Sequence, residues 1–365
     1  MVSKTRKEEL RRVCSIFYIV CASLLSLWCV TVFTPTQKPQ FLQSTHSKRV
    51  RVVFAGDVMM HTPQLYRAKV DSGYDFNSCF RYVKPIFEAA DIAVVNLETT
   101  LSAEAPYSGY PAFRAPAELA SALANMGVDV AVTANNHALD AGAKGVATTI
   151  DILAKYGIKS TGSFKDSVDY ANRNPLIINS KGVKIALLAY TYGTNGIPVP
   201  KDVVVNLLDT VSMKRDIARC QQMGVDCTIA FLHWGAEYSH RENSEQRQIA
   251  KCLHRAGCQV VVGSHPHVVQ GAEVSKREVT IYSLGNFISN QRMRGSDGGI
   301  IAQVDIEKSG DGCQFWVDII PVWVRQRDYS VIPRSVGDTL RLSEDERSTY
   351  RLFMADISKK VLTLI

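Results

Sequence analysis

The feature that most constrains the fold of this chain is a repeated alternation of short apolar runs with amphipathic stretches. Nine runs have the length and apolar, largely β-branched character of buried strands: 51–57, 91–98, 129–136, 184–192, 227–235, 258–266, 279–287, 300–307 and 315–324. Helical stretches separate the earlier runs, at about 77–90, 116–126, 140–156, 210–223 and 243–256. The alternation predicts an α/β fold with parallel strands and outer helices, whereas the last strands lack intervening helices and should be antiparallel.

An uncharged apolar segment lies near the N-terminus. No charged residue occurs between Arg12 and Lys38, and residues 13–34 are long enough for an apolar helix that crosses a bilayer. Basic residues within 1–12 predict a cytoplasmic tail. We therefore expect a single-pass transmembrane signal-anchor over 13–34, a polar linker over 35–49, and a main domain outside the cell membrane. Cleavage as a signal peptide and lipidation are the alternatives.

The formal net charge of +7 comes almost entirely from this N-terminal region. Residues 1–49 contain eight Lys or Arg and two Glu, so the rest of the chain is nearly neutral. The composition therefore gives no support for nucleic-acid binding. Six cysteines lie beyond residue 49 and would permit disulfides, but their spacing is scattered and we expect most of them to be buried free thiols.

Polar residues at the ends of the predicted strands are the main indication of function. Parallel-sheet enzymes place their sites beyond the carboxyl ends of strands. Five strand ends here carry carboxylate, amide or imidazole groups: Asp57, Asn96 with Glu98, Asn135 to His137, His233, and His265 with His267. Each group alone has a plainer explanation, such as a helix cap, a turn or a packed core histidine. Together they predict a site for Mn, Zn or Fe, where two divalent ions could activate a water.

Six motifs carry a family resemblance. They are FAGDVMMHTP, VNLETTLS, ANNHALDAG, FLHWGAEY, GSHPHVVQG and SLGNFISNQ, within residues 51–291. Their order resembles that of the CapA family, named for poly-γ-glutamate capsule synthesis, which in turn resembles the calcineurin-like metallophosphoesterases. The resemblance implies a four-layer sandwich, in which two mixed β-sheets are flanked by helices and a dinuclear metal centre lies at one edge.

The resemblance also implies a role for each motif residue. Asp57 and His267 would bind the first metal, and Glu98 would bridge the two metals. Asn136, His233 and His265 would bind the second metal. His137 would assist the leaving group as a proton donor, and Asp140 would orient the ring of His137.

Two departures from the superfamily pattern bear on the metals. Met59 stands where the superfamily has a histidine and cannot replace a hard ligand, while His61 has the wrong spacing. Glu98 is longer than the aspartate that usually bridges. The prediction is therefore two divalent ions, Mn, Zn or Fe, with a site that holds only one as the alternative.

Two functions are consistent with these residues. The first is a metal-dependent hydrolase, phosphoesterase-like or amide-cleaving, that acts in the biosynthesis, export or processing of a capsule or poly-γ-glutamate-like polymer. The second is a non-catalytic accessory subunit of a polymer synthase or export complex. The expected partners are the polymer or its precursor, membrane proteins of that complex, and the membrane itself. We expect the main domain over 50–330 and a C-terminal extension over 331–365, with a closing helix that Ser343 and Glu346 begin as a capping box.

Overall fold

The computed structural model describes residues 48–361. The predicted cytoplasmic tail and anchor, and all but the end of the linker, lie outside this range. Within residues 48–361, no helix is both long enough and apolar enough to cross a membrane.

The first sheet has eight strands and is mixed. Its parallel strands are β1 (Lys48–Val58), β4 (Ile92–Leu97), β7 (Val130–Val132), β8 (Lys159–Thr161) and the short β17 (Asn286–Ile288), which pairs with the end of β1. Its antiparallel strands, on the other side of β1, are β18 (Gly298–Ser309), β19 (Gly312–Val324) and β20 (Val331–Pro333). The strands β18, β19 and β20 confirm the predicted antiparallel pairing late in the chain, whereas β17, which also follows no helix, is parallel to β1.

The second sheet has six strands and is also mixed. Its parallel strands are β11 (Val183–Thr191), β13 (Cys227–His233), β14 (Val260–Ser264) and β16 (Val279–Ile281). Antiparallel strands close its two edges, β10 (Leu176–Ser180) and β15 (Ala272–Val274). Three further strand pairs lie outside the two sheets: β2 (Lys69–Val70) with β3 (Gly73–Tyr74), β5 (Thr100–Ser102) with β6 (Arg114–Pro116), and β9 (Ser163–Phe164) with β12 (Val204–Val205).

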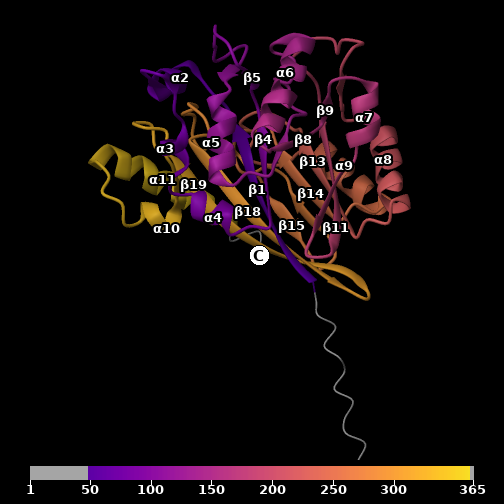
Figure 1. Cartoon of the computed structure of the whole chain (residues 1–365). Coiled ribbons are helices and arrows are strands. Elements are labelled where there is room, and N and C mark those ends of the chain that lie inside the picture. The colour runs from indigo at the N-terminus through magenta and orange to yellow at the C-terminus, as the bar shows by residue number, and fades with distance from the viewer. Residues whose placement is uncertain (1–47, 362–365) are drawn as a thin grey trace, which may run out of the picture. The chain divides into compact units, whose positions relative to one another are not determined.

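The helices connect these strands (Figure 1). They are α2 (Thr62–Ala68), α3 (Asn77–Phe80), α4 (Lys84–Glu88), α5 (Glu118–Met126), α6 (Gly142–Lys155), α7 (Ser167–Arg173), α8 (Thr210–Gln222), α9 (Ser244–Ala256), α10 (Arg334–Gly337) and α11 (Glu344–Val361). Gly127 and Gly257 end α5 and α9 with φ of 107° and 100°, a conformation that glycine adopts without strain. These two helices therefore end where the predicted stretches 116–126 and 243–256 end.

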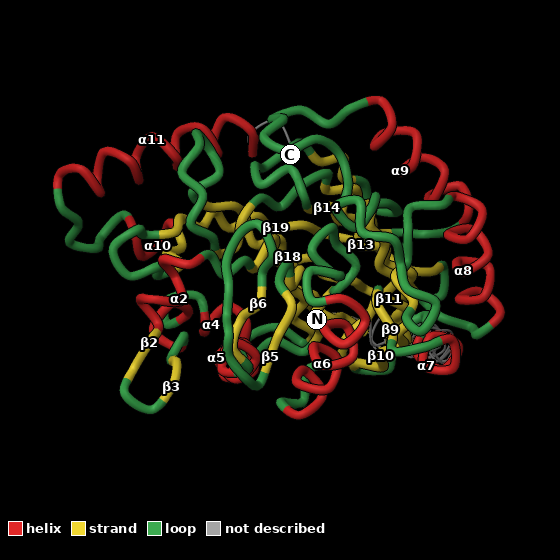
Figure 2. Tube along the Cα trace, turned by 90° about the horizontal axis from the view of Figure 1, so that it is seen from above, coloured by secondary structure: helices red, strands yellow, loops and turns green. Residues whose placement is uncertain are grey.

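The two sheets pack face to face, with helices on their outer faces. Phe54 of β1 and Phe231 of β13 meet in the core between the sheets, their ring centroids 6.5 Å apart. On the outer face of the second sheet, Leu188 packs with residues of α8 and α9, and on that of the first sheet Val95 packs with residues of α5. Figure 2 shows α8 and α9 on one side of the strands and α5 on the other. The α/β fold with two mixed sheets is thus confirmed.

The C-terminal segment joins the first sheet and the core. β20 pairs with β19, and Tyr350 of α11 lies 5.8 Å from Trp323 between ring centroids. Ser343 and Glu346 form the expected capping box at the start of α11, since the backbone N–H of each donates to the side chain of the other. The six cysteines of the described range are free, and all but Cys252 are buried.

The sequence pattern is wrong about one strand. Residues 279–287 read as a single strand, but β16 ends at Ile281 in the second sheet and β17 begins at Asn286 in the first. Gly285, with φ of 70°, lies in the crossing between the sheets. The crossing brings Asn286 beside Asp57.

Candidate metal centre

The predicted site residues converge where strands of both sheets end. Asp57 lies near the end of β1, Glu98 directly follows β4, and His233 is the last residue of β13. The loop after β14 adds His265 and His267. No predicted ligand is more than 3% exposed: Asp57, Glu98, Asn136, His233, His265 and His267. The structure therefore brings together every residue that the sequence predicts as a metal ligand.

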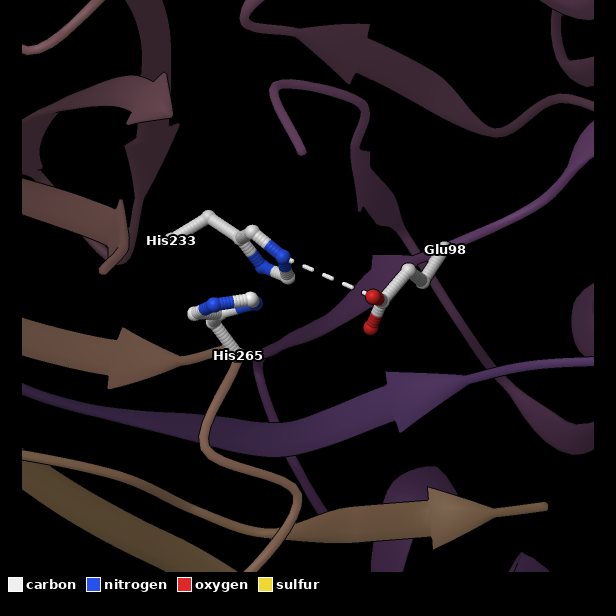
Figure 3. A group of neighbouring side chains, drawn as sticks. All are labelled: Glu98, His233 and His265. Carbon is white, nitrogen blue, oxygen red and sulfur yellow. Dashed lines mark ion pairs between the residues drawn. The ribbon is translucent and has the colours of Figure 1, made fainter. Parts of the chain in front are cut away.

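Glu98 occupies the middle of this cluster. Its side chain is fully buried, and neither carboxylate oxygen accepts a hydrogen bond within the described structure. Its Oε1 lies 3.5 Å from Nε2 of His233 and 4.0 Å from Nε2 of His267. Figure 3 shows Glu98 reaching toward the ring of His233, with the ring of His265 alongside. Burial, and then the nearby charge of Asp57, raise the pKa of Glu98 well above its ordinary value.

Two overlapping groups could each hold a metal ion. One consists of Glu98, His233 and His265, and the other of Asp57, Glu98 and His267. Within each group the three ligand atoms lie within 4.8 Å of one another, and the two groups share Glu98. Carboxylate oxygens and imidazole nitrogens suit Mn, Zn and Fe, and a cation would satisfy the two unpaired oxygens of Glu98. The donor set therefore fits divalent metal.

Asp57 and His267 form an ion pair in the structure. Nδ1 of His267 lies 3.0 Å from Oδ2 of Asp57, while Nδ2 of Asn96 donates to Oδ1 over 2.8 Å. Burial alone would raise the pKa of Asp57, but the hydrogen bond and charge of His267 lower it to about 2. Burial alone would lower the pKa of His267, but Glu98 and Asp57 raise it to about 9. Metal binding in this group would therefore displace a proton from His267.

His233 and His265 are held as neutral rings. Burial lowers the pKa of His233 to about 3, and burial together with the neighbouring histidines lowers that of His265 to about 2. Nε2 of His233 lies 2.8 Å from Oδ1 of Asn136, and its Nδ1 lies 2.9 Å from Oγ of Ser264. Nδ1 of His265 is buried without a partner. Neutral imidazoles with free lone pairs are the form that binds metal.

The loop after β14 holds its two histidines in an unusual backbone conformation. His265 and His267 have φ of 98° and 58°, in the region that side chains other than glycine rarely occupy. Such strained residues persist where surrounding contacts fix them, and they concentrate at functional sites. Here each imidazole has a ring nitrogen within 4.8 Å of a carboxylate oxygen of Glu98.

His137 and Asp140 lie next to the ligand cluster. Nδ1 of His137 lies 2.8 Å from Oδ2 of Asp140, which also accepts the backbone N–H of Phe113 over 2.6 Å. The ring of Phe113 packs edge-on against His137, with centroids 4.7 Å apart. Burial opposes the charged form, but the hydrogen bond to Asp140 together with the charges of Glu98 and Asp140 raises the pKa of His137 above its ordinary value. The bond to Asp140 also fixes the orientation of the imidazole ring.

Met59 contributes no ligand, in agreement with its side-chain chemistry. It is buried, and its backbone N–H donates to Ile288 of β17. His61 does not take its place: Nδ1 of His61 faces Gln64 at 3.2 Å and the backbone N–H of Asn290 at 3.3 Å. Among the described residues, the metal-capable groups do not include His61.

Three further residues position the cluster, and sequence reasoning missed two of them, Ser264 and Tyr192. Ser264 contacts His233, and the ring of Tyr192 packs at a tilt against that of His265 with centroids 4.5 Å apart. Nδ2 of Asn135 donates to the backbone oxygen of Leu97 over 2.8 Å, which holds the Asn136 loop against the end of β4. Of these only Ser264 and Asn135 lie beside a predicted ligand in the sequence. Tyr192 directly follows β11, and it lies beside His265 because β11 pairs with β13 in the second sheet.

The fold and the site together define a class of protein: a two-sheet α/β domain with a buried His/Glu/Asp group that can bind metal. Comparison with known families agrees with the motifs, since residues 51–291 match the family described as "Bacterial capsule synthesis protein PGA_cap". The match covers more than half of the chain, which therefore belongs to this family.

Curated relatives carry related names. The chain is 29% identical over 324 residues to "PGA biosynthesis protein CapA" of Bacillus subtilis (strain 168), covering 85% of this chain and 79% of the relative. It is 25% identical over 374 residues to "Capsule biosynthesis protein CapA" of Bacillus anthracis, covering 99% and 86%. A "Probable polyglutamine synthesis accessory protein" of Mycobacterium tuberculosis is 25% identical over 215 residues, or 55% of this chain and 56% of the relative.

Solved structures show a weaker likeness. An NAD nucleotidase of Haemophilus influenzae aligns with a TM-score of 0.49 and 11% identity, over 85% of this chain and 63% of that one. A 5'-nucleotidase of Candida albicans aligns with a TM-score of 0.44 and 12% identity, over 85% and 58%. The fold assignment accordingly rests on the sheet topology itself.

Proposed function

We propose that this chain is a metal-dependent hydrolase that acts in the biosynthesis, export or processing of a capsule or cell-surface polymer of the poly-γ-glutamate type. Its substrate would be the polymer or a precursor, with a phosphoryl or amide bond at the reacting centre. The observation that carries the proposal is Glu98, a fully buried carboxylate whose two oxygens lack hydrogen bonds within the described structure and which belongs to two of the metal-capable groups. The family and the names of the relatives support the polymer.

The ligand set follows from the geometry. Asp57, Glu98 and His267 would hold one divalent ion, while Glu98, Asn136, His233 and His265 would hold a second. Divalent ions in such a pair supply an activated water and polarise the oxygen of the bond to be cleaved. Asn96 donates to Asp57, and Ser264 holds Nδ1 of His233 so that Nε2 faces Glu98 and Asn136.

His137 would donate the proton to the leaving group. Its Nδ1 is bound to Asp140, which leaves Nε2 as the nitrogen that delivers a proton. The raised pKa of His137 favours the protonated form before the reaction, as a general acid requires. Asp140 is itself fixed by the N–H of Phe113, so the ring orientation does not depend on a mobile carboxylate.

Location and partners follow from the sequence. The uncharged segment 13–34 would anchor the chain in the cell membrane, with residues 1–12 in the cytoplasm and the metal centre outside. The described domain would then meet its polymer where synthase or export membrane proteins deliver it. The relative with the name of a synthesis accessory protein supports a role beside a synthase.

A non-catalytic accessory subunit is the second candidate. The buried thioether of Met59 favours it, because the position offers no hard ligand and a centre that holds one ion could have lost its catalytic role. In this case the metal centre would serve only to hold the loops after β4, β13 and β14 together.

Elemental analysis and a hydrolysis screen separate the two candidates. The purified full-length chain is stripped of metal, reloaded with Mn²⁺ or Zn²⁺, and compared with the variant that carries both His265→Ala and His267→Ala. Hydrolysis of bis(p-nitrophenyl) phosphate or γ-glutamyl p-nitroanilide, lost in this variant and in His137→Ala, would support the hydrolase. Bound metal with neither substrate cleaved would favour the accessory subunit, and no bound metal under any loading condition would refute the metal centre.

A further inference from the structure

The loop that follows β13 folds back over the ligand cluster. Trp234 is buried, and its indole N–H donates to the backbone oxygen of Tyr282 over 2.9 Å, which fixes the start of the loop. Gly235 then turns the chain with φ of 90°, where an added Cβ would lie 2.9 Å from the side chain of Gln246. The loop path is therefore set immediately after the last strand residue.

The far end of this loop is tied to the histidine pair. The backbone N–H of Tyr238 donates over 2.8 Å to the backbone oxygen of Pro266, the residue between His265 and His267. Tyr238 has φ of 60°, and its ring centroid lies 5.9 Å from that of His267. Residues 234–238 are thus held at both ends against the loop after β14.

This path places Glu237 on the solvent side of the two histidines. Glu237 is exposed, unlike the other candidate ligands, but one of its carboxylate oxygens and a ring nitrogen from each of His265 and His267 lie within 4.8 Å of one another. The group is a third metal-capable set, which shares His265 with one of the two Glu98 groups and His267 with the other. Two histidines and one glutamate form a ligand set typical of catalytic zinc.

The Asp57 group of the centre has three protein ligands, Asp57, Glu98 and His267. The thioether of Met59 is not a hard donor and does not extend this set. A catalytic zinc takes three ligands from the protein, whereas manganese or iron takes more. Glu237 lies within ligand range of His267, a member of this group, and would add an oxygen donor without any change in the buried cluster.

We propose that Glu237 is a metal ligand, bound on the solvent side of the centre beside His265 and His267, which supplies an oxygen donor that Met59 cannot. This inference rests on the proposed metal centre and adds a residue to it. It implies that Glu237 binds the more exposed of the ions. The affinity for this ion would then depend on the hydrogen bonds of Trp234 and Tyr238 that hold residues 234–238 in place.

Zinc affinity of the full-length chain tests the assignment directly. The metal-stripped chain is titrated with Zn²⁺ in the presence of a competing chelator, for wild type, Glu237→Gln, Glu237→Asp and Glu245→Gln. Glu245 is an exposed carboxylate at the start of α9, so its variant makes the same charge change outside the site. We expect Glu237→Gln to weaken the weakest-bound zinc by about tenfold or more, the smallest effect that loss of even a supporting residue usually has. Glu237→Asp should retain part of the affinity, and Glu245→Gln should match wild type.

The outcomes distinguish this inference from the metal centre on which it rests. Equal zinc affinity in Glu237→Gln and Glu245→Gln, with zinc lost from the His265→Ala, His267→Ala variant, would refute Glu237 as a ligand and leave the centre intact. Unchanged zinc binding in the double histidine variant would refute the centre and Glu237 together. Because Glu237 is exposed, the metal-free melting temperature should be the same in wild type and Glu237→Gln; a lower value in the variant would count against a ligand role and for a structural one.

Discussion

At the scale of single residues, Glu98 is in an unfavourable environment for a carboxylate. A carboxyl group buried without hydrogen bonds costs free energy of folding, and the neighbouring Asp57 adds repulsion of like charges. A residue with this cost is maintained where a cation offsets it. Bound metal would therefore relieve the unfavourable burial of the Glu98 charge and its repulsion by Asp57.

Removing the charge of Glu98 should stabilise the metal-free chain. Glu98→Gln keeps the shape and removes the ionisable group, so the buried side chain no longer has a charge to desolvate or to repel Asp57. We expect the free energy of unfolding at pH 7 to rise by about 1 kcal/mol or more, the equivalent of about one pKa unit. Folding raises the pKa of Glu98, so its contribution favours folding at low pH and is lost as pH rises above the ordinary value of 4.5. The difference in free energy of unfolding between Glu98→Gln and wild type, measured by urea melts, should therefore increase as the pH rises above 4.5.

Bound metal should make wild type more stable than Glu98→Gln. With saturating Zn²⁺ the wild type gains the linkage free energy of binding, whereas Glu98→Gln binds metal more weakly and gains less. A Glu98→Gln chain that is less stable than wild type without metal would contradict the assigned cost. One that gains as much stability from zinc as wild type would contradict the ligand role.

His137 and Asp140 carry a second prediction at this scale. If His137 is the general acid, His137→Ala should lower kcat by about 10²–10⁴-fold. Asp140→Asn should have a smaller effect but should move the alkaline limb of the kcat profile to lower pH. Burial opposes a proton on His137 and the bond to Asp140 favours one, so loss of the Asp140 charge lowers the pKa of the ring. The measurement is kcat against pH with metal content confirmed unchanged; identical profiles for Asp140→Asn and wild type would refute the role.

At the scale of elements, the strand ends explain why the site could be read from the sequence. Buried parallel strands are apolar almost throughout, so a carboxylate or imidazole that directly follows one, such as Glu98 after β4 or His233 in β13, stands out against its neighbours. The order of strands then brings these ends together. The parallel pairing and the helix-ending glycines are likewise local properties, and the structure agrees with both.

Other parts of the site depend on contacts that no local pattern encodes. Glu237 lies four residues past the end of β13, and its position depends on the bond from Tyr238 to Pro266, a residue distant in sequence. Within residues 279–287, Gly285 and Asn286 interrupt the apolar pattern, but a Gly-Asn pair does not distinguish the end of a strand from a crossing between two sheets. The predicted helix over 77–90 is interrupted between Phe80 and Lys84, and its two pieces are α3 and α4.

The pairing of β1 with β18 provides a prediction at the element scale. Arg51 and Asp305 are directly opposite in this pair, and Nε of Arg51 donates to Oδ1 of Asp305 over 2.9 Å. The bond to Arg51 is the main cause of a lowered pKa for Asp305. Asp305→Asn should destabilise the chain at neutral pH by about 1 kcal/mol, since Arg51 is partly in solvent and the pair is screened.

The sign of the pH effect follows from the direction of that shift. A carboxyl whose pKa is lowered by folding stabilises the fold above its unfolded value, 3.8, and loses this contribution as the pH falls through the folded value. The gap in melting temperature between wild type and Asp305→Asn should therefore close below pH 3.8. The exposed Asp311 is the control, and Asp311→Asn should match wild type throughout. A gap that persists at low pH would show that the charge of Asp305 is not its cause.

At the scale of the whole molecule, the described residues contain a complete two-sheet core of their own. Both sheets, the helices on their outer faces and the closing helix α11 lie within residues 48–361, and the core between the sheets contains residues from β1 to α11. Folding and membrane attachment are therefore expected to be separable properties of the chain.

Deletion of residues 1–46 tests this separation. The full-length chain, expressed in a bacterium, should sediment with membranes and resist a carbonate wash, because an apolar helix of about 20 residues crosses a bilayer and is not removed as a peripheral protein is. The shortened chain should remain in the soluble fraction and melt at the same temperature as the full-length chain in detergent. Protease added to spheroplasts should digest the full-length domain if that domain faces outward, whereas a fusion partner joined to residue 1 should survive. A full-length product whose measured mass lacks the segment would identify a cleaved signal peptide instead, and a digested N-terminal partner beside a protected domain would show the opposite orientation.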